Sequence, residues 1–186
     1  MSALLDFDAQ IAIKKISANN ASKYPEWEFE VENWDLRALL GIELLQDLQA
    51  NPATTDNANL LNGCTFVNNK GYTVTHKGVL FVLAYLVHSY YIGKSFVSDT
   101  FSGFVQKNRP DAAQLSEGNI RRLQEDDRRI ALSEFEVVRQ FLNANSSLYP
   151  LWLEGQKTKP YTPRFSGIKK TGSIGNNSSY TDFITL

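Results

Sequence analysis

The chain has 186 residues, of which 42% are hydrophobic and 21% are charged, and its formal net charge is −1. This length fits one domain with appendages, and the near-neutral balance gives no overall basic field that would attract nucleic acid. Cys64 is the single cysteine, which excludes an intramolecular disulfide. The first ten residues carry acids where a secretion signal needs a basic region, so we expect a cytosolic protein.

The N-terminal residues 1–16 alternate loosely between apolar and polar side chains, which predicts a short strand or an arm. The polar stretch 17–22 is typical of a break in regular structure. We therefore expect residues 1–23 to form an N-terminal arm or short strand that precedes the main domain.

A helix is predicted from Tyr24, with Pro25 suited to its first turn. Four residues at a spacing of i, i+4, i+7 and i+11 predict a stripe that faces the core: Trp27, Val31, Trp34 and Ala38. Gly41 allows a break, and residues 42–49 continue as a short second helix that ends before Asn51 and Pro52.

A β-hairpin is predicted at about residues 64–75, after an exposed loop at 50–59 that Leu60 and Leu61 anchor. Two short alternating runs, CTFV and YTVT, flank the turn residues Asn68, Asn69, Lys70 and Gly71.

The most apolar stretch of the chain follows at residues 75–94, THKGVLFVLAYLVHSYYIGK. Thr75 is expected to cap a helix that runs to about Ile92, with Gly93 as its C-terminal cap. Its apolar run is shorter than the roughly 20 residues that span a bilayer. Because it is apolar all round, we predict a central helix that at least three other helices cover.

Residues 95–115 read as a loop in which Phe101 and Phe104 flank Gly103, and we expect this loop to pack against another surface. Ser116 is then predicted to cap a long helix over 117–143. Its second half has a core stripe in Ala131, Phe135, Val138 and Leu142, whereas Ile120 and Leu123 are the apolar contacts of its first half. Residues 148–153 supply a final apolar plug.

The long helix is densely charged at residues 121–129, RRLQEDDRR. The acid pair Asp126 and Asp127 is most simply interpreted as part of a solvated, salt-bridged face. The functional alternative is a contact surface between subunits, since arginine is frequent at interfaces. The candidate contacts on this helix are Arg121, Arg122, Arg128 and Arg129.

The character of the chain changes in residues 155–186, which hold five basic residues and one acid, whereas the first 154 residues hold 14 basic and 19 acidic residues. Such a composition cannot bury enough apolar surface to order itself. Aromatic residues nevertheless recur in it, at Tyr161, Phe165, Tyr180 and Phe183. We interpret this segment as an extended arm that orders against a partner, with an idle disordered tail as the alternative.

No residue pattern predicts catalysis or a bound cofactor. His76 and His88 lack a partner at the i+4 spacing of a zinc helix, and we interpret both as core or capping residues. No Cys–His pairing is evident for Cys64, which we interpret as a small buried thiol. We therefore predict that the chain is not an enzyme and holds neither metal nor cofactor.

Several short motifs resemble small helical head–tail connector proteins of tailed bacteriophages. Residues 39–44, LLGIEL, resemble an "LLG-x-E-L" step of these proteins, and LAYL at 83–86 after Gly78 is similar. The loop at 100–107 and the Tyr-Pro pair at 149–150 extend the likeness. It covers about residues 24–153 and is to connector and adaptor ring proteins of crAss-like and other Bacteroidales phages.

The resemblance implies a structural virion protein, made in the host cytoplasm and located at the head–tail junction. It implies a mainly α-helical bundle (residues 24–154) that assembles as a homo-oligomeric ring, commonly of twelve copies, between the portal protein and the tail. DNA would be passing cargo in a conduit that the ring helps to form, and no membrane would be involved. Arms and C-terminal tails of the family reach neighbouring subunits or adjacent rings.

A second hypothesis comes from a different functional class. A small helical nucleic-acid-binding or regulatory protein would use the basic tail and Arg121, Arg122, Arg128 and Arg129 to contact phosphates, with steeply salt-dependent binding.

Overall fold

The computed structural model describes residues 4–95, 97–100, 103–106 and 116–152, and these parts of the chain are mainly helical. The first half contains α1 (Phe7–Ile13), a 3-10 turn (Ala18–Asn20), α2 (Tyr24–Val31), the π-helical turn η2 (Glu32–Leu36), α3 (Arg37–Leu40), α4 (Ile42–Ala50) and α5 (Thr55–Asn62). The second half contains β1 (Thr65–Val67), β2 (Thr73–Thr75), α6 (Val79–Ser95), β3 (Val97–Thr100), β4 (Gly103–Gln106) and α7 (Glu117–Ala144). The predicted small helical bundle with a short hairpin is confirmed.

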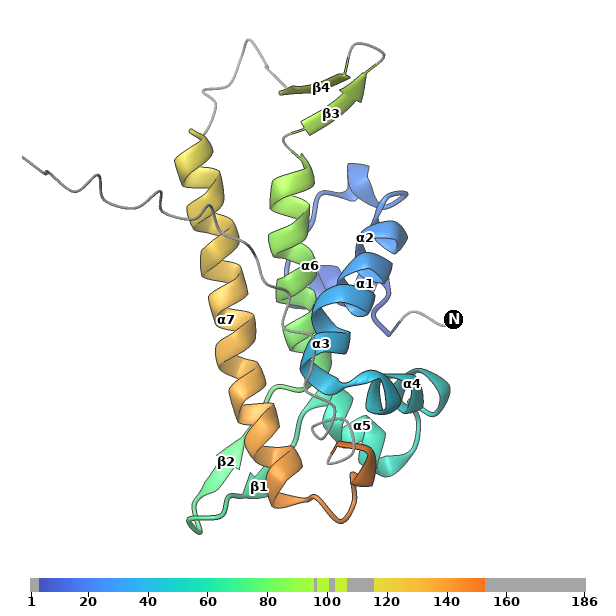
Figure 1. Cartoon of the computed structure of the whole chain (residues 1–186), viewed down its shortest axis with the longest axis vertical. Coiled ribbons are helices and arrows are strands. Elements are labelled where there is room, and N and C mark those ends of the chain that lie inside the picture. The colour runs from blue at the N-terminus through green and yellow to red at the C-terminus, as the bar shows by residue number, and fades with distance from the viewer. Residues whose placement is uncertain (1–3, 96, 101–102, 107–115, 153–186) are drawn as a thin grey trace, which may run out of the picture.

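The bundle is organised around α6, which lies between α7 on one side and the helices of the N-terminal half on the other (Figure 1). Helices α6 and α7 run antiparallel as a long pair, with the β1–β2 hairpin at one end and the β3–β4 hairpin at the other. The residues of α6 that are buried lie on every side of it: Val79, Val82, Leu83, Ala84, Leu86, Val87, Ser89 and Ile92. No helix in the described parts of the chain is long and apolar enough to cross a membrane.

The strand predicted near the N-terminus is wrong, because residues 7–13 form α1. The Asp6 carboxylate accepts a hydrogen bond from Ala9 N–H at 2.7 Å and caps the helix. Gln10 is buried and its amide donates to Ala84 O of α6 at 3.2 Å. A helix of seven residues whose innermost side chain is polar shows too little of the 3.6-residue period to be recognised.

The core stripe predicted from Trp27 is right at Trp27 and Val31 and wrong at Trp34, which is 68% exposed. The reason is η2, a π-helical turn that inserts one extra residue into the helix. After this insertion the buried positions are Leu36 and Leu40 instead of Trp34 and Ala38. The chain then breaks at Gly41 with φ 87°, and α4 follows as predicted.

Part of the loop predicted at residues 50–59 is α5, so that prediction is wrong from Thr55 onward. Its buried polar residue, Asn57, donates at 3.0 Å to Asn51 O and at 3.0 Å to the Asp47 carboxylate. Because only Leu60 and Leu61 of this helix are apolar and buried, its sequence reads as a loop.

The predicted hairpin at 64–75 is confirmed as β1 paired antiparallel with β2. Phe66 points inward from it and meets the Phe141 ring of α7 edge-on, with 5.3 Å between centroids. Thr75 pairs with Thr65 in this hairpin, so its predicted role as the cap of α6 is wrong.

The predicted end of α6 at Gly93 is also wrong, because the helix continues to Ser95. Gly93 lies where α7 crosses closely, and a Cβ there would lie 2.4 Å from Gln124 Nε2. Gln124 and Ser89 join the two helices through a pair of hydrogen bonds, of 3.2 Å from the amide to Ser89 O and 3.0 Å from the hydroxyl to Gln124 O.

The segment predicted as a loop at 95–115 contains the antiparallel pair β3–β4, which the prediction missed. Farther along, the Ser116 hydroxyl caps α7 by accepting from Asn119 N–H at 3.3 Å, as predicted. All four residues of the predicted α7 stripe are buried, whereas Leu123 is exposed, contrary to expectation. In the final plug, Tyr149 and Trp152 are buried and Leu148 is exposed.

Candidate functional site

Of the predicted contact residues, the structure describes the side chains of the four arginines only. Phe104 is in β4, where its backbone pairs with that of Asp99. The remaining aromatic candidates lie outside the described residues: Phe101, Tyr161, Phe165, Tyr180 and Phe183.

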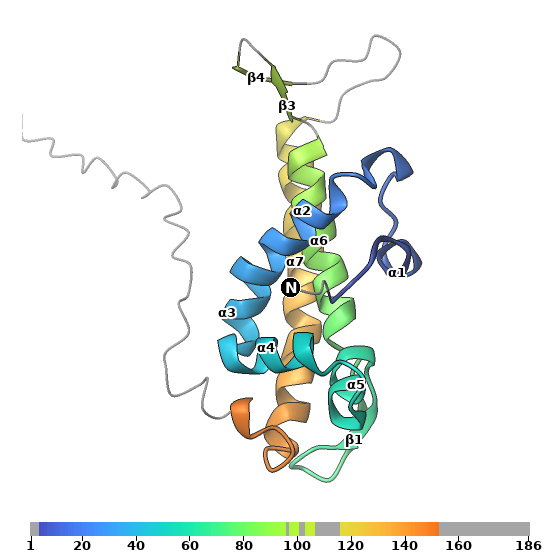
Figure 2. The same ribbon diagram turned by 90° about the vertical axis from the view of Figure 1, so that its right-hand side faces the viewer.

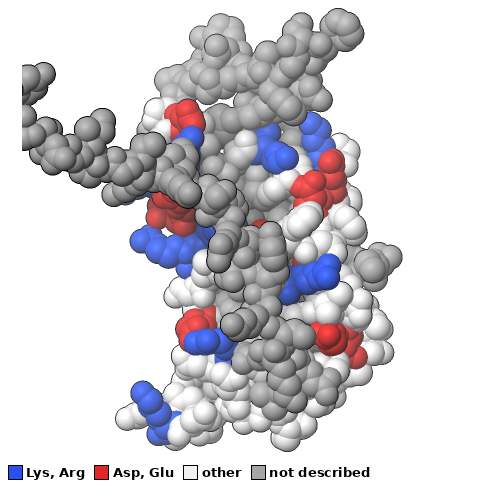
Figure 3. All heavy atoms as spheres, in the orientation of Figure 1, with Lys and Arg blue, Asp and Glu red and all other residues white. Residues whose placement is uncertain are grey.

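The four candidate arginines of α7 form two rows instead of one basic surface, since residues seven apart share a helix face. Arg121 pairs with Glu117 at 2.6 Å, and Arg128, seven residues on, pairs with Asp35 of η2. Arg122 and Arg129 form the second row on the solvent side, where Arg129 pairs with Asp126 at 2.9 Å. Figure 3 shows Lys and Arg interspersed with Asp and Glu on one face of the molecule, with neither sign gathered.

The solvated face predicted for Asp127 is wrong, because its side chain is buried where α1, α6 and α7 meet. Asp127 is only 5% exposed. One carboxylate oxygen lies 3.0 Å from Lys14 Nζ and the other lies 2.6 Å from His88 Nδ1. The burial of Asp127 could have been predicted from the spacing of residues along the helix. Asp127 follows the buried Ile120 by seven residues and precedes the buried Ala131 by four, so the three share one helix face.

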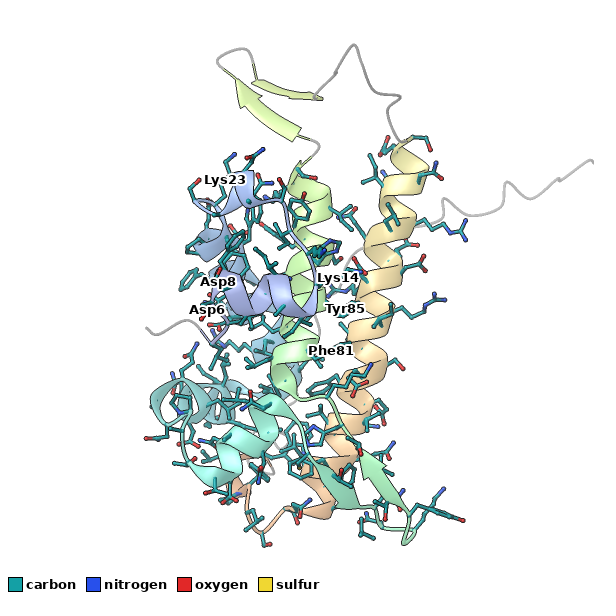
Figure 4. All side chains as sticks on the ribbon, turned by 180° about the vertical axis from the view of Figure 1, so that it is seen from behind. Asp6, Asp8, Lys14, Lys23, Phe81 and Tyr85 are labelled. Atoms are coloured by element: carbon teal, nitrogen blue, oxygen red, sulfur yellow. The ribbon has the colours of Figure 1, made fainter. Side chains whose placement is uncertain are left out.

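Two lysines cover the aromatic side chains that α6 presents beside this cluster. Lys14 Nζ lies 4.7 Å from the centroid of Tyr85, and Lys77 Nζ lies 4.3 Å from that of Phe81. The two rings are themselves in contact, with 4.6 Å between centroids. A cation over an aromatic face is attracted by the ring quadrupole. Figure 4 shows Lys14, Tyr85 and Phe81 following one another along the junction of α6 and α7.

The α7 side of this junction presents Leu123 and Ile130, which are exposed. Ile130 lies between Asp127, which binds Lys14, and Glu134, which accepts a hydrogen bond from Lys77 N–H at 2.8 Å. Leu123 lies one turn before Asp127 on the same side. We call this surface the α6–α7 seam; it consists of Lys14, Lys77, Phe81, Tyr85, Leu123 and Ile130.

A second surface of mixed aromatic and acidic character lies on α2 and η2. Phe29 and Trp34 are exposed there, at the end of α2 and in the π-helical turn that follows it. The side chain of Asn33 is tied back to Phe29 O at 2.8 Å. We call this surface the aromatic face; it consists of Glu26, Phe29, Glu30, Asn33 and Trp34.

A buried pair of carboxyl groups holds the N-terminal segment against α2. Glu28 and Glu32 are 2% and 3% exposed. Leu4 N–H donates to Glu28 Oε1 at 3.1 Å and to Glu32 Oε1 at 2.9 Å. Gln49 Nε2 donates to the other Glu32 oxygen at 2.8 Å. Burial, with the adjacent Glu32 as the next cause, raises the pKa of Glu28 from 4.5 to about 8, so Glu28 carries a proton at neutral pH.

Raising the pH from about 5 to about 8 is therefore expected to lower the free energy of unfolding. The folded chain keeps the Glu28 proton that the unfolded chain releases near pH 4.5, so stability is lost as the pH rises through this window. The slope should approach about 1.4 kcal/mol per pH unit in urea denaturation curves. Glu28→Gln should remove this slope, whereas Glu30→Gln on the outer surface should keep it; equal slopes in wild type and E28Q would contradict the assignment.

A thiol–imidazole contact joins Cys64 and His76, which the sequence did not reveal. Cys64 Sγ lies 3.3 Å from His76 Nε2. Burial raises the pKa of Cys64 and lowers the pKa of His76, with Glu134 opposing the latter weakly. Both groups are therefore neutral, and His76 stacks on Phe141 at 4.4 Å. His76 thus packs in the core, between the Cys64 thiol and the Phe141 ring.

The comparisons with known proteins give one match. No curated protein and no solved structure matches this sequence. A family model described as a family of unknown function (DUF6712) matches residues 36–162, from the end of η2 through α7 and beyond. Since this is more than half of the chain, the protein belongs to that family.

Proposed function

We propose that this protein is a structural virion protein, a subunit of a head–tail connector or adaptor ring between the portal and the tail of a phage. The observation that carries the proposal is the aromatic face, where two large aromatic side chains, Phe29 and Trp34, are 54% and 68% exposed. Large exposed aromatic side chains mark contact surfaces with other proteins. The short motifs that resemble phage connector proteins indicate which kind of assembly these contacts serve.

The shape of the subunit suits a ring. Its long α6–α7 pair carries a β-hairpin at each end (Figure 1), so neighbours can be contacted along the sides and stacked rings at the ends. A ring forms when one surface of each copy binds a different surface of the next and the rotation closes. Repeated contacts around such a ring allow each single interface to be modest.

Residues 155–186 complete the proposal as an arm that joins neighbouring rings. Their sequence combines a net charge of +4 with aromatic residues at intervals, whereas the first 154 residues have a net charge of −5. A segment that orders only on binding leaves the free subunit soluble and adds contacts after docking. The acidic body would line a DNA conduit without gripping its phosphates.

The nucleic-acid-binding alternative receives less support from the charges. Arg121, Arg128 and Arg129 each pair with a carboxylate of the same chain, which reduces the positive charge they offer to phosphates. The aromatic face, moreover, is bordered by acids, which repel a phosphate backbone.

Deletion of residues 155–186 is expected to leave a folded body that no longer joins the neighbouring ring. Helical circular dichroism should be retained, and co-purification with portal or adjacent ring proteins should be lost. The full chain should be found at the head–tail junction of purified virions. A full chain that never joins such a complex would refute the proposed function, and a deletion that assembles normally would refute the arm alone.

A further inference from the structure

We propose that two copies of this chain join side to side, with the aromatic face of one copy docked on the α6–α7 seam of the next. This inference rests on the proposed function in that it names the contact from which the ring would be built. It assigns a role to Trp34, Tyr85 and Lys77 that none of the motifs suggested.

The elements that carry the two surfaces meet α7 at different positions, since Lys14, beside α1, binds Asp127 and Asp35 of η2 binds Arg128. In Figure 2, α1 lies on one side of the α6–α7 pair and α3, which continues from η2, lies on the other. The seam is on the α1 side, since Lys14 follows α1 directly and covers Tyr85 there (Figure 4). The aromatic face and the seam of one copy therefore cannot meet each other, but they can meet between copies in a head-to-tail arrangement.

The charges of the two surfaces are complementary. Residues 24–36 contain five acids and no base. Glu28 and Glu32 are buried against the N-terminal segment, and Asp35 pairs with Arg128. Glu26 and Glu30 remain on the aromatic face, next to Phe29 and Trp34.

The seam, in contrast, is positively charged, and its two lysines lie over aromatic rings. The ammonium groups of Lys14 and Lys77 lie above the rings of Tyr85 and Phe81. Lys14 is shared with the buried Asp127, whereas the exposed Lys77 is held in place by its backbone bond to Glu134. A carboxylate that approaches Lys77 completes an ion pair without disturbing the buried cluster.

The apolar parts of the two surfaces match as well. Trp34 and Phe29 protrude from one, and the other offers Leu123 and Ile130 beside the partly exposed rings of Phe81 and Tyr85. An exposed tryptophan that becomes buried in an apolar setting surrounded by charged groups has the make-up of an interface hot spot. A second copy is favoured over an unrelated protein because one chain carries both complementary halves, on separate elements of its surface.

Sedimentation velocity of the full chain at increasing protein concentration tests the contact. Wild type is expected to associate, and Trp34→Ala is expected to weaken association by about 30-fold or more, as for a central interface residue. Tyr72→Ala is the matched control, since Tyr72 is also 68% exposed but lies on the β1–β2 hairpin, and it should associate like wild type. A wild type that is monomeric at every concentration, or equal effects of W34A and Y72A, would overturn the proposal.

Disulfide trapping tests which surfaces meet. In a Cys64→Ser background, chains carrying Asn33→Cys are mixed with chains carrying Ile130→Cys, and linked dimers are expected in the mixture. A mixture of Asn33→Cys with Tyr72→Cys should give only background linkage, and the same yield in both mixtures would overturn the contact. The contact and the proposed function can be refuted separately. If the chain self-associates through these residues but is absent from virions, only the function is refuted. If W34A assembles into virions as wild type does, only the contact is refuted.

Discussion

Replacing Gly78 by alanine is expected to lower the free energy of unfolding by at least about 3 kcal/mol. Gly78 precedes α6 with φ 87°, a conformation that is unfavourable for alanine. A Cβ would also lie 2.2 Å from Leu61 O and 2.5 Å from Gly63 N. These are backbone atoms, so the end of α5 and the start of α6 would have to separate.

The matched control is Gly71→Ala in the β1–β2 turn. Gly71 has a similar φ of 82°, but nothing lies within 4 Å of a Cβ built there. Its replacement should cost only the backbone strain, about 1–2 kcal/mol. Urea denaturation followed by circular dichroism measures both changes. Equal losses for G78A and G71A would mean that the close contact of the two backbone segments contributes nothing.

Gly63 shows that this contact is reciprocal. A Cβ at Gly63 would lie 2.4 Å from His76 O, and its φ is 90°. The two glycines therefore let the segments before β1 and after β2 touch directly, which places the hairpin against the end of α7. In the sequence each glycine resembles an ordinary helix end or turn, and only the crossing of the two segments explains both.

The elements predicted correctly from the sequence are those whose apolar pattern extends over several helical turns or whose ends carry clear turn residues. The all-apolar run of α6 and the stripe of α7 each extend over several turns, and the hairpin has a turn of four suitable residues. Helices α1 and α5 were missed because they are short and bury polar side chains, Gln10 and Asn57, in hydrogen bonds to other segments. Such partners lie elsewhere in the chain, so no local pattern reveals them.

The surfaces were harder to predict than the elements. Trp34 was placed in the core because a regular helix of 3.6 residues per turn puts it there, and one π-helical turn reverses this. The seam combines Lys14, which follows α1, with Tyr85 of α6 and Ile130 of α7, and no spacing in the sequence connects these residues. The charged half of α7 was predicted as a possible contact surface, but its four arginines lie on two faces, and its acid Asp127 is buried.

Removal of the Asp127 carboxylate is expected to be the most damaging change to a charged side chain of α7. Asp127→Ala leaves the Lys14 ammonium and the His88 imidazole without the group that binds both. Breaking a buried ion pair by removing one partner costs about 3–5 kcal/mol. Because the Lys14 side chain is 30% exposed and can recover some hydration, we expect about 2–4 kcal/mol.

Asp126→Ala provides the control one residue away. Asp126 pairs with the exposed Arg129 on the solvent side, and such a surface pair contributes about 0–1 kcal/mol. Asp127→Asn should lie between the two, because its amide oxygen still accepts a hydrogen bond from His88. The free energies of unfolding from urea titrations rank the three variants, and similar losses for D126A and D127A would contradict the burial of Asp127.

A double replacement separates the charge from the space that it fills. Lys14→Met together with Asp127→Leu removes both charges and retains apolar volume. The free energy of unfolding of this double variant should therefore fall by less than that of Asp127→Ala alone. The difference measures the penalty of an unpaired charge at the junction of α1, α6 and α7. If the double variant is less stable than Asp127→Ala, the cluster stabilises the fold through the hydrogen bond to His88 and not through the pairing of Lys14 with Asp127.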